Sequence, residues 1–177
     1  AYYNRGLAKY NLEDTEGAIA DYTKAIQLNP QYSEAYYNRG TIKVDLGNKE
    51  GAIADYTKAI EVNPQYSEAY YNRGNAKFNL GDNKGAIADY TKAIELNPKF
   101  ADAYNNRGLS KSALGDNKGA IADFTKAIEL NPQLTLTYNN RGLSKSGLRD
   151  REGAIADFTK AIELNSQYAN AYYNRAA

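Results

Sequence analysis

The side chains best suited to polar chemistry in this sequence recur as a pair, asparagine followed by arginine. The hexapeptide AYYNRG begins at residues 1, 35 and 69, and close variants begin at residues 103, 137 and 171. A carboxamide offers both a hydrogen-bond donor and an acceptor, and a guanidinium offers a planar fork that suits a carboxylate. Packing alone asks only for apolar residues, so this recurrence predicts a binding or structural role for each member of the pair.

Catalytic chemistry has few candidate residues in this chain. The sequence contains no histidine and no cysteine, which removes the commonest general base, the thiol nucleophile and the usual ligands of transition metals. The segment GLSKSG at residues 142–147 is not a G-x-S-x-G nucleophile motif, and GDNKGA lacks the spacing of a phosphate-binding loop. We therefore expect a protein that is not an enzyme and that uses no metal and no cofactor.

The composition is typical of a globular protein without a dominant charge. Hydrophobic residues make up 42% and charged residues 24% of the 177 residues, and the formal net charge is +1. No global field attracts the protein to nucleic acid, and no apolar run approaches the ~18 residues that a membrane span needs. We therefore expect neither nucleic acid nor a membrane as a partner, and the lack of cysteine leaves the compartment open.

A spacing of 34 residues organises the whole chain. A second block, GAIADYTKAI, begins at residues 17, 51 and 85, and GAIADFTKAI begins at residues 119 and 153. Such a period is the signature of a stacked array of repeats. The sequence predicts a single domain over 1–177, with full repeats at 1–34, 35–68, 69–102, 103–136 and 137–170 and part of a sixth at 171–177. Because the chain begins and ends inside a repeat, we expect a piece of a longer protein.

Each repeat is predicted to form two helices. In the second repeat the first helix covers about 33–46, and Gly47 suits the left-handed residue that follows a helix. The second helix covers about 50–62 and ends before Pro64, because proline cannot continue a helix. Apolar residues of this second helix recur with helical spacing and form one face. Small residues within the pattern allow neighbouring helices to approach closely.

The period and the pattern of small, aromatic and proline residues identify a family. In the second repeat the pattern consists of Tyr36, Gly40, Ala52, Tyr56, Ala59 and Pro64. The chain resembles the tetratricopeptide repeat over its whole length. The resemblance implies an all-α fold, a right-handed superhelical solenoid of antiparallel helix pairs. It also implies that the first helices line the concave side and the second helices the convex side.

The recurring arginine is predicted to be structural, since an arginine on a packing face is costly unless it is paired. A recurring aspartate of the second helices is its expected partner. We predict pairs between adjacent repeats, namely Asp21–Arg39, Asp55–Arg73, Asp89–Arg107, Asp123–Arg141 and Asp157–Arg175, with Arg5 unpaired. The alternative is a pair within each repeat, which leaves Arg175 unpaired. The lysines at 9, 43, 77, 111 and 145 are expected to lie on a solvated face.

The recurring asparagine is predicted to hold a ligand. The resemblance implies that the position points into the groove of peptide-binding members, and it is occupied here by Asn4, Asn38, Asn72, Asn106, Asn140 and Asn174. One carboxamide can bond both the C=O and the N–H of an extended peptide. The alternative interpretation is that these asparagines bond neighbouring helix backbones and tie the stack together.

The walls of the implied groove vary along the chain. On the register of the family they consist of Tyr3, Leu7, Tyr10, Asn11, Tyr37, Thr41, Val44, Asp45, Tyr71, Asn75, Phe78, Asn79, Asn105, Leu109, Ser112, Ala113, Asn139, Leu143, Ser146 and Gly147. The first three repeats are bulky and aromatic, whereas the last two are small and carry two leucines. We therefore expect a pocket for an apolar side chain over residues 109–147.

Two functions follow from these features. The first is a protein-interaction scaffold that binds extended peptide segments of a protein partner through the asparagine ladder. The alternative is a structural module that associates with itself, because the end faces of a repeat array expose apolar surface that normally contacts another repeat. In that case copies of the chain would stack end to end as a homo-oligomer.

Overall fold

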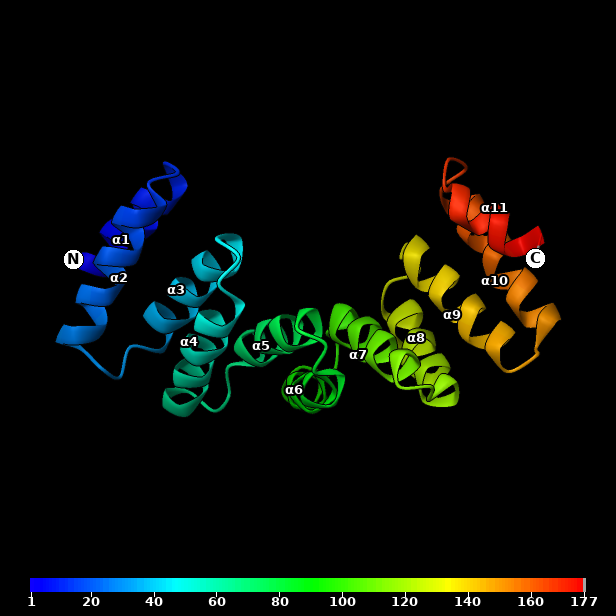
Figure 1. Ribbon diagram of the computed structural model, residues 1–177, viewed down its shortest axis with the longest axis horizontal. Coiled ribbons are helices and arrows are strands. Elements are labelled where there is room, and N and C mark those ends of the chain that lie inside the picture. The colour runs from blue at the N-terminus through cyan, green and yellow to red at the C-terminus, as the bar shows by residue number, and fades with distance from the viewer. Residues whose placement is uncertain (177) are drawn as a thin grey trace. The chain divides into compact units, whose positions relative to one another are not determined.

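The computed structural model describes residues 1–176, which form α-helices joined by short turns, with no strand among them (Figure 1). The helices gather into two compact units, Ala1–Leu96 and Asn97–Ala177. Ala177, the last residue of the predicted partial repeat, lies outside the described residues. The single domain over 1–177 stays a prediction, and each unit is described by itself.

Both units are built from helix pairs, and the second unit ends with one further helix. The first unit contains α1 (Tyr2–Asn11), α2 (Thr15–Leu28), α3 (Ser33–Asp45), α4 (Lys49–Val62), α5 (Ser67–Asn79) and α6 (Asn83–Leu96). The second unit contains α7 (Ala101–Ala113), α8 (Asn117–Leu130), α9 (Thr135–Gly147), α10 (Arg151–Leu164) and α11 (Ala169–Ala176). Within each unit every helix packs against its neighbours in the chain. The predicted all-α fold of stacked helix pairs is confirmed.

The second helix of each pair begins at a polar side chain that caps it. Asp14, Asn48, Asp116 and Asp150 each accept a hydrogen bond from the backbone N–H three residues later, at 2.9 or 3.0 Å. These bonds satisfy N–H groups that the helix itself leaves without a partner. The caps fix where α2, α4, α8 and α10 start and therefore how each helix faces its partner.

The turn inside each pair requires a left-handed residue. Gly47, Gly81 and Gly115 occupy it with φ of 78°, 84° and 84°. Glu13 and Arg149 adopt the same conformation without being glycine, with φ of 63° and 66°. A left-handed backbone costs an L-residue ~1–2 kcal/mol, so these two turns are strained where the other three are relaxed.

The core lies both within the helix pairs and between adjacent repeats, and it consists of small residues, isoleucines and one large ring in the second helix of each repeat. The buried rings are Tyr22, Tyr56, Tyr90, Phe124 and Phe158. A Cβ added at Gly74 would lie only 2.7 Å from the ring of Tyr90, so a side chain at this position would displace the ring. Glycine therefore lets the first helix of a pair approach the ring of the second.

Candidate functional site on the first helices

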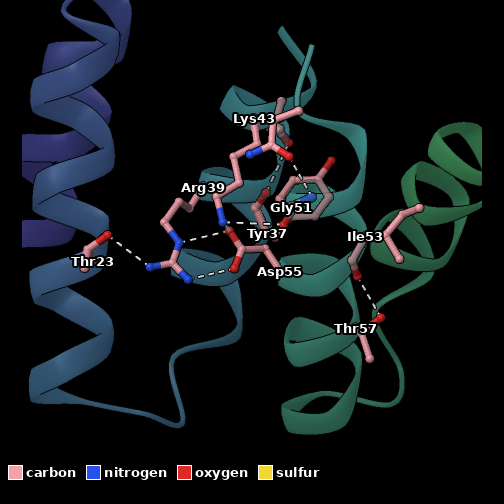
Figure 2. A network of polar contacts seen from close by, with 10 residues as sticks. Thr23, Tyr37, Arg39, Lys43, Gly51, Ile53, Asp55 and Thr57 are labelled. Carbon is pink, nitrogen blue, oxygen red and sulfur yellow. Dashed lines mark hydrogen bonds and ion pairs between the residues drawn. The ribbon is translucent and has the colours of Figure 1, made fainter. Parts of the chain in front are cut away.

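The recurring arginines bond the aspartate of their own repeat. Arg39 donates from Nε and Nη2 to Asp55 Oδ2 and Oδ1 at 2.9 and 2.7 Å, and from Nη1 to Thr23 Oγ1 of the preceding repeat at 3.0 Å. Figure 2 shows Arg39 lying between Thr23 of α2 and Asp55 of α4. The same two-fold bond joins Arg5–Asp21, Arg73–Asp89, Arg107–Asp123 and Arg141–Asp157.

The predicted pairs between repeats, Asp21–Arg39 through Asp157–Arg175, are therefore wrong, and the alternative of pairs within each repeat is correct. The reason is geometric. The short aspartate side chain keeps its carboxylate against the first helix of its own pair, where the arginine fork meets it with two parallel bonds. In Arg39, Arg73 and Arg141, Nη1 then donates to a threonine of the preceding repeat. Among the described residues Arg175 forms no ion pair, and its guanidinium lies 5.6 Å from the centre of the Tyr172 ring.

The recurring lysines also bind the buried aspartates, contrary to the expectation that they lie on a solvated face. Lys43 Nζ lies 2.7 Å from Asp55 Oδ2, and the Lys43 side chain is 23% exposed. Lys9, Lys77, Lys111 and Lys145 repeat this contact at 2.8 to 3.2 Å. The hydrogen bond from Arg5, aided by Lys9, lowers the pKa of the Asp21 carboxyl to about 2. Arg5 and Lys9 thus hold the Asp21 carboxylate in its charged form.

The ladder asparagines of the first unit cross the boundary between repeats. Asn38 Nδ2 donates to the Tyr3 hydroxyl at 3.0 Å, and Asn72 Nδ2 donates to the Tyr37 hydroxyl at 2.8 Å. Their partners are side chains, not the helix backbones that the alternative interpretation named. Within residues 1–176 the carboxamide oxygens of Asn38 and Asn72 accept no hydrogen bond. Each carboxamide thus joins two repeats through its Nδ2, and its oxygen stays available as an acceptor.

The second unit uses different partners for the same position. Asn174 Nδ2 donates to Asn139 Oδ1 at 2.9 Å. Asn139 is only 4% exposed, so it is a buried acceptor and not an open wall residue as expected. Asn105 Oδ1 instead accepts from Thr137 Oγ1 at 2.9 Å. Asn140 is half-buried, and its side chain forms no hydrogen bond within the described part of the chain.

A hollow lies between the first helices α3 and α5. Its volume is about 130 Å³, and its lining consists of Thr41, Val44, Asp45, Tyr56, Asn72, Asn75, Ala76 and Asn79. Most of these residues are at positions that the sequence predicts to line a groove. Tyr10 also reaches this side, because its hydroxyl donates to Asp45 Oδ2 at 2.7 Å, a bond that raises the pKa of Tyr10.

The predicted aromatic wall residues are partly used for packing. The ring centre of Tyr37 lies 4.9 Å from that of Tyr66 in the next turn and 5.7 Å from that of Tyr56, and burial raises the pKa of Tyr37. The ring centre of Tyr71 lies 5.9 Å from that of Tyr90, and Tyr71 is half-buried. Phe78 and Leu109 are half-buried, whereas Leu143 and Asn4 are exposed.

Sequence reasoning missed the threonine that receives the third arginine bond. Thr57 and Thr125 accept from Arg73 and Arg141 as Thr23 does from Arg39, at 3.0 and 3.1 Å. The threonine recurs in the fixed tetrapeptides YTKA and FTKA, so the recurrence itself was the available signal. No group of three or more acidic side chains in residues 1–176 could hold a metal ion, and no helix there is long and apolar enough to cross a membrane.

Comparisons with known proteins agree with this architecture. The family profile described as tetratricopeptide repeat matches residues 1–32, 67–100 and 101–134, and related repeat profiles match residues 21–54, 40–81 and 136–168. No curated protein matches the sequence.

Solved structures share the fold over nearly the whole chain. A crystal structure of MamA has 32% identity and a TM-score of 0.88, over 93% of this chain and 96% of that one. MamA 41-end from Desulfovibrio magneticus RS-1 has 21% identity and a TM-score of 0.87, over 95% of both chains. YrrB, described as a TPR protein with an unusual peptide-binding site, has 24% identity and a TM-score of 0.90, over 99% of this chain and 91% of that one. The chain belongs to the tetratricopeptide repeat family.

Proposed function

We propose that this protein-interaction scaffold binds an extended peptide segment of a protein partner across the exposed faces of its first helices. The observation that carries the proposal is the hollow between α3 and α5. Its lining joins carboxamides, a carboxylate and apolar groups, among them Asn72, Asn79, Asp45 and Val44. Binding sites combine an apolar lining with a few polar groups that fix orientation, and this lining does so.

The polar groups of these faces suit a peptide main chain. A free carboxamide oxygen accepts from a peptide N–H, and a free amide N–H donates to a peptide carbonyl. An extended peptide rises ~3.3 Å per residue and helices pack 8–10 Å apart, so ~3 peptide residues would pass each first helix. YrrB, a protein of the same fold described as having a peptide-binding site, supports the proposal by analogy.

The test is selection of a peptide from a random phage-displayed library against the whole chain. The selected peptide, made with blocked termini, is titrated calorimetrically into the wild type, into Asn79→Arg on α5 and into Leu143→Arg on α9. Both side chains are exposed. At least one of these two variants is expected to weaken binding about tenfold, because arginine would block the face or leave a cation unpaired.

Ala54→Arg on the exposed face of α4 is the matched control and should bind as the wild type does. The proposal fails if no peptide binds the wild type. It fails equally if both first-helix variants bind normally while Ala54→Arg does not, since the ligand would then lie on the second helices.

Self-association is a second candidate function, and two further hollows favour it. One of about 280 Å³ at α1 is lined in part by Tyr2, Leu28 and Tyr32. Another of about 310 Å³ at α10 and α11 includes Ile155, which is exposed, and Phe158. Apolar surface buried between copies would contribute ~25 cal/mol per Å². Sedimentation equilibrium tests this function: a mass that stays monomeric at the highest concentrations would exclude it.

A further inference from the structure

The fifth repeat breaks the asparagine ladder at one residue. Asn38, Asn72 and Asn174 each donate to the side chain 35 positions earlier. For Asn140 that side chain is Asn105, and its Oδ1 already accepts from Thr137 Oγ1. Every other occurrence of the hexapeptide has alanine in place of threonine at its first position. Thr137 Oγ1 therefore donates to Asn105 Oδ1 in the place where the ladder pattern would put the Asn140 amide.

The consequence is a carboxamide with both of its functions available. Asn140 is half-buried on α9, and its side chain forms no hydrogen bond with any described residue. Asn38 and Asn72 each use Nδ2 to hold the preceding repeat. A carboxamide whose Nδ2 is already bonded has only its oxygen available to a peptide, whereas an unbonded carboxamide has both its donor and its acceptor available. Asn140 is thus better equipped than Asn38 or Asn72 to bond both the C=O and the N–H of a ligand residue.

The surroundings of Asn140 indicate which side chains the ligand carries there. Leu136 is 60% exposed and Leu143 is 46% exposed, four residues before and three residues after Asn140. Residues with these spacings lie on one stripe of a helix. The position of Leu136 is taken by Glu34 on α3 and Glu68 on α5. The α9 stripe is therefore apolar and uncharged where its counterparts in the first unit are acidic.

The geometry of an extended chain fits this stripe. Leu136 and Leu143 lie ~10 Å apart along the helix, from a rise of 1.5 Å per residue. When an amide bonds the edge of an extended strand, successive side chains point to opposite sides of it. A strand crossing α9 at Asn140 would thus direct one side chain toward Leu136 and the next toward Leu143.

We propose that Asn140 anchors the main chain of the bound peptide and that Leu136 and Leu143 receive two successive apolar side chains of it. Thr137 is a positioning residue, which keeps Asn140 free by occupying Asn105. This inference rests on the proposed function, because the face of α9 is one of the first-helix faces that are proposed to bind peptide. It differs from an even ladder, in which every asparagine contributes alike.

The test uses the peptide selected against the whole chain, titrated into three variants. Asn140→Ala is expected to weaken binding about tenfold, since two main-chain bonds are lost. Asn72→Ala is the comparison variant and is expected to weaken binding less than Asn140→Ala does, by about threefold at most, because only its carboxamide oxygen is available to a peptide. Thr137→Ala is expected to weaken binding about threefold without touching the peptide, because Asn105 then becomes an acceptor for Asn140.

A second measurement does not depend on the variants folding well. In the wild type, the side-chain amide resonances of Asn140 should shift more on titration with the peptide than those of Asn38 and Asn72 do. The selected peptides should also share two adjacent apolar residues.

The outcomes distinguish a failure of this inference from a failure of the proposed function. If Asn72→Ala abolishes binding while Asn140→Ala leaves it unchanged, the anchor is elsewhere and the inference is wrong, but peptide binding stands. Selected peptides with charged residues at the anchored pair would overturn the inference in the same way. If the wild type binds no peptide from the library, the inference and the proposed function fall together.

Discussion

The hydroxyl of Tyr22 provides the sharpest test of the core. Tyr22 and Tyr90 are both fully buried rings at the same position of their repeats. Tyr90 donates its hydroxyl hydrogen bond to Asn75 Oδ1 at 2.8 Å. The residue equivalent to Asn75 is Leu7, and within residues 1–176 the buried Tyr22 hydroxyl has no partner. The two rings therefore differ in whether the hydroxyl donates to an acceptor.

Removal of the two hydroxyls should have opposite effects. A buried hydroxyl without a partner costs ~1–3 kcal/mol, and phenylalanine keeps the buried ring, so Tyr22→Phe should raise the free energy of unfolding by about 1 kcal/mol. Tyr90→Phe removes a satisfied hydrogen bond and should lower it by about 1 kcal/mol. Leu7→Asn should supply the missing acceptor, so that Tyr22→Phe becomes unfavourable in that background.

Urea unfolding followed by circular dichroism measures these differences. Repeat arrays need not unfold in one step, so hydrogen exchange of the α2 and α6 amides should accompany it. A coupling energy of about 1–2 kcal/mol between Leu7→Asn and Tyr22→Phe is expected for a new bond. The reasoning would be refuted if Tyr22→Phe destabilised α2 as much as Tyr90→Phe destabilises α6.

Three further predictions concern charge, strain and pH. Asp55→Asn should lower the unfolding free energy by about 3 kcal/mol in urea titrations, because it leaves two cations facing a buried neutral group; an unchanged midpoint would contradict this. Arg149→Gly should raise stability by ~0.5–1 kcal/mol by relieving the left-handed backbone, and Gly81→Ala should lower it by a similar amount in the same assay. The pKa of Asp21 is lowered to about 2, so its stabilisation is complete above its ordinary value of 3.8 and is lost as pH falls toward 2. Below pH 3.8 the urea midpoint of Asp21→Asn should therefore fall less steeply with pH than that of the wild type. If the two curves fall equally, other groups cause the loss of stability in acid.

The helices were predictable because the same signals occur five times. The predicted limits of the second repeat, 33–46 and 50–62, differ from α3 and α4 by one residue at two of four ends. The left-handed turn at Gly47 and the stop before Pro64 are backbone constraints of single residues, so they can be identified without any tertiary contact.

The direction of the ion pairs was not predictable from spacing. Asp55 has an arginine at a fixed distance on either side, Arg39 and Arg73, and both choices repeat equally well along the sequence. Only the rotation of α4 about its axis distinguishes them, and that rotation is set by the packing of Tyr56 against Gly40. The sequence also did not predict that Asn140 lacks the ladder bond, because this depends on the hydrogen bond between Thr137 and Asn105.

The bonds that cross repeat boundaries bear on how such a chain evolves in length. If residues 35–68 were lost by recombination, Asn72 would follow Tyr3 at the spacing that Asn38 has now, and Arg73 would follow Thr23 in the same way. Both donors would regain an acceptor of the same kind, and Tyr10 would meet Asn79 in place of Asp45, so loss of this repeat leaves an acceptor for each of the three. The fifth repeat is an exception. Thr137 bonds Asn105, and the second and third repeats have tyrosine at that position. The fifth repeat would therefore lose this bond if it followed either of them, so selection would act on its place in the array.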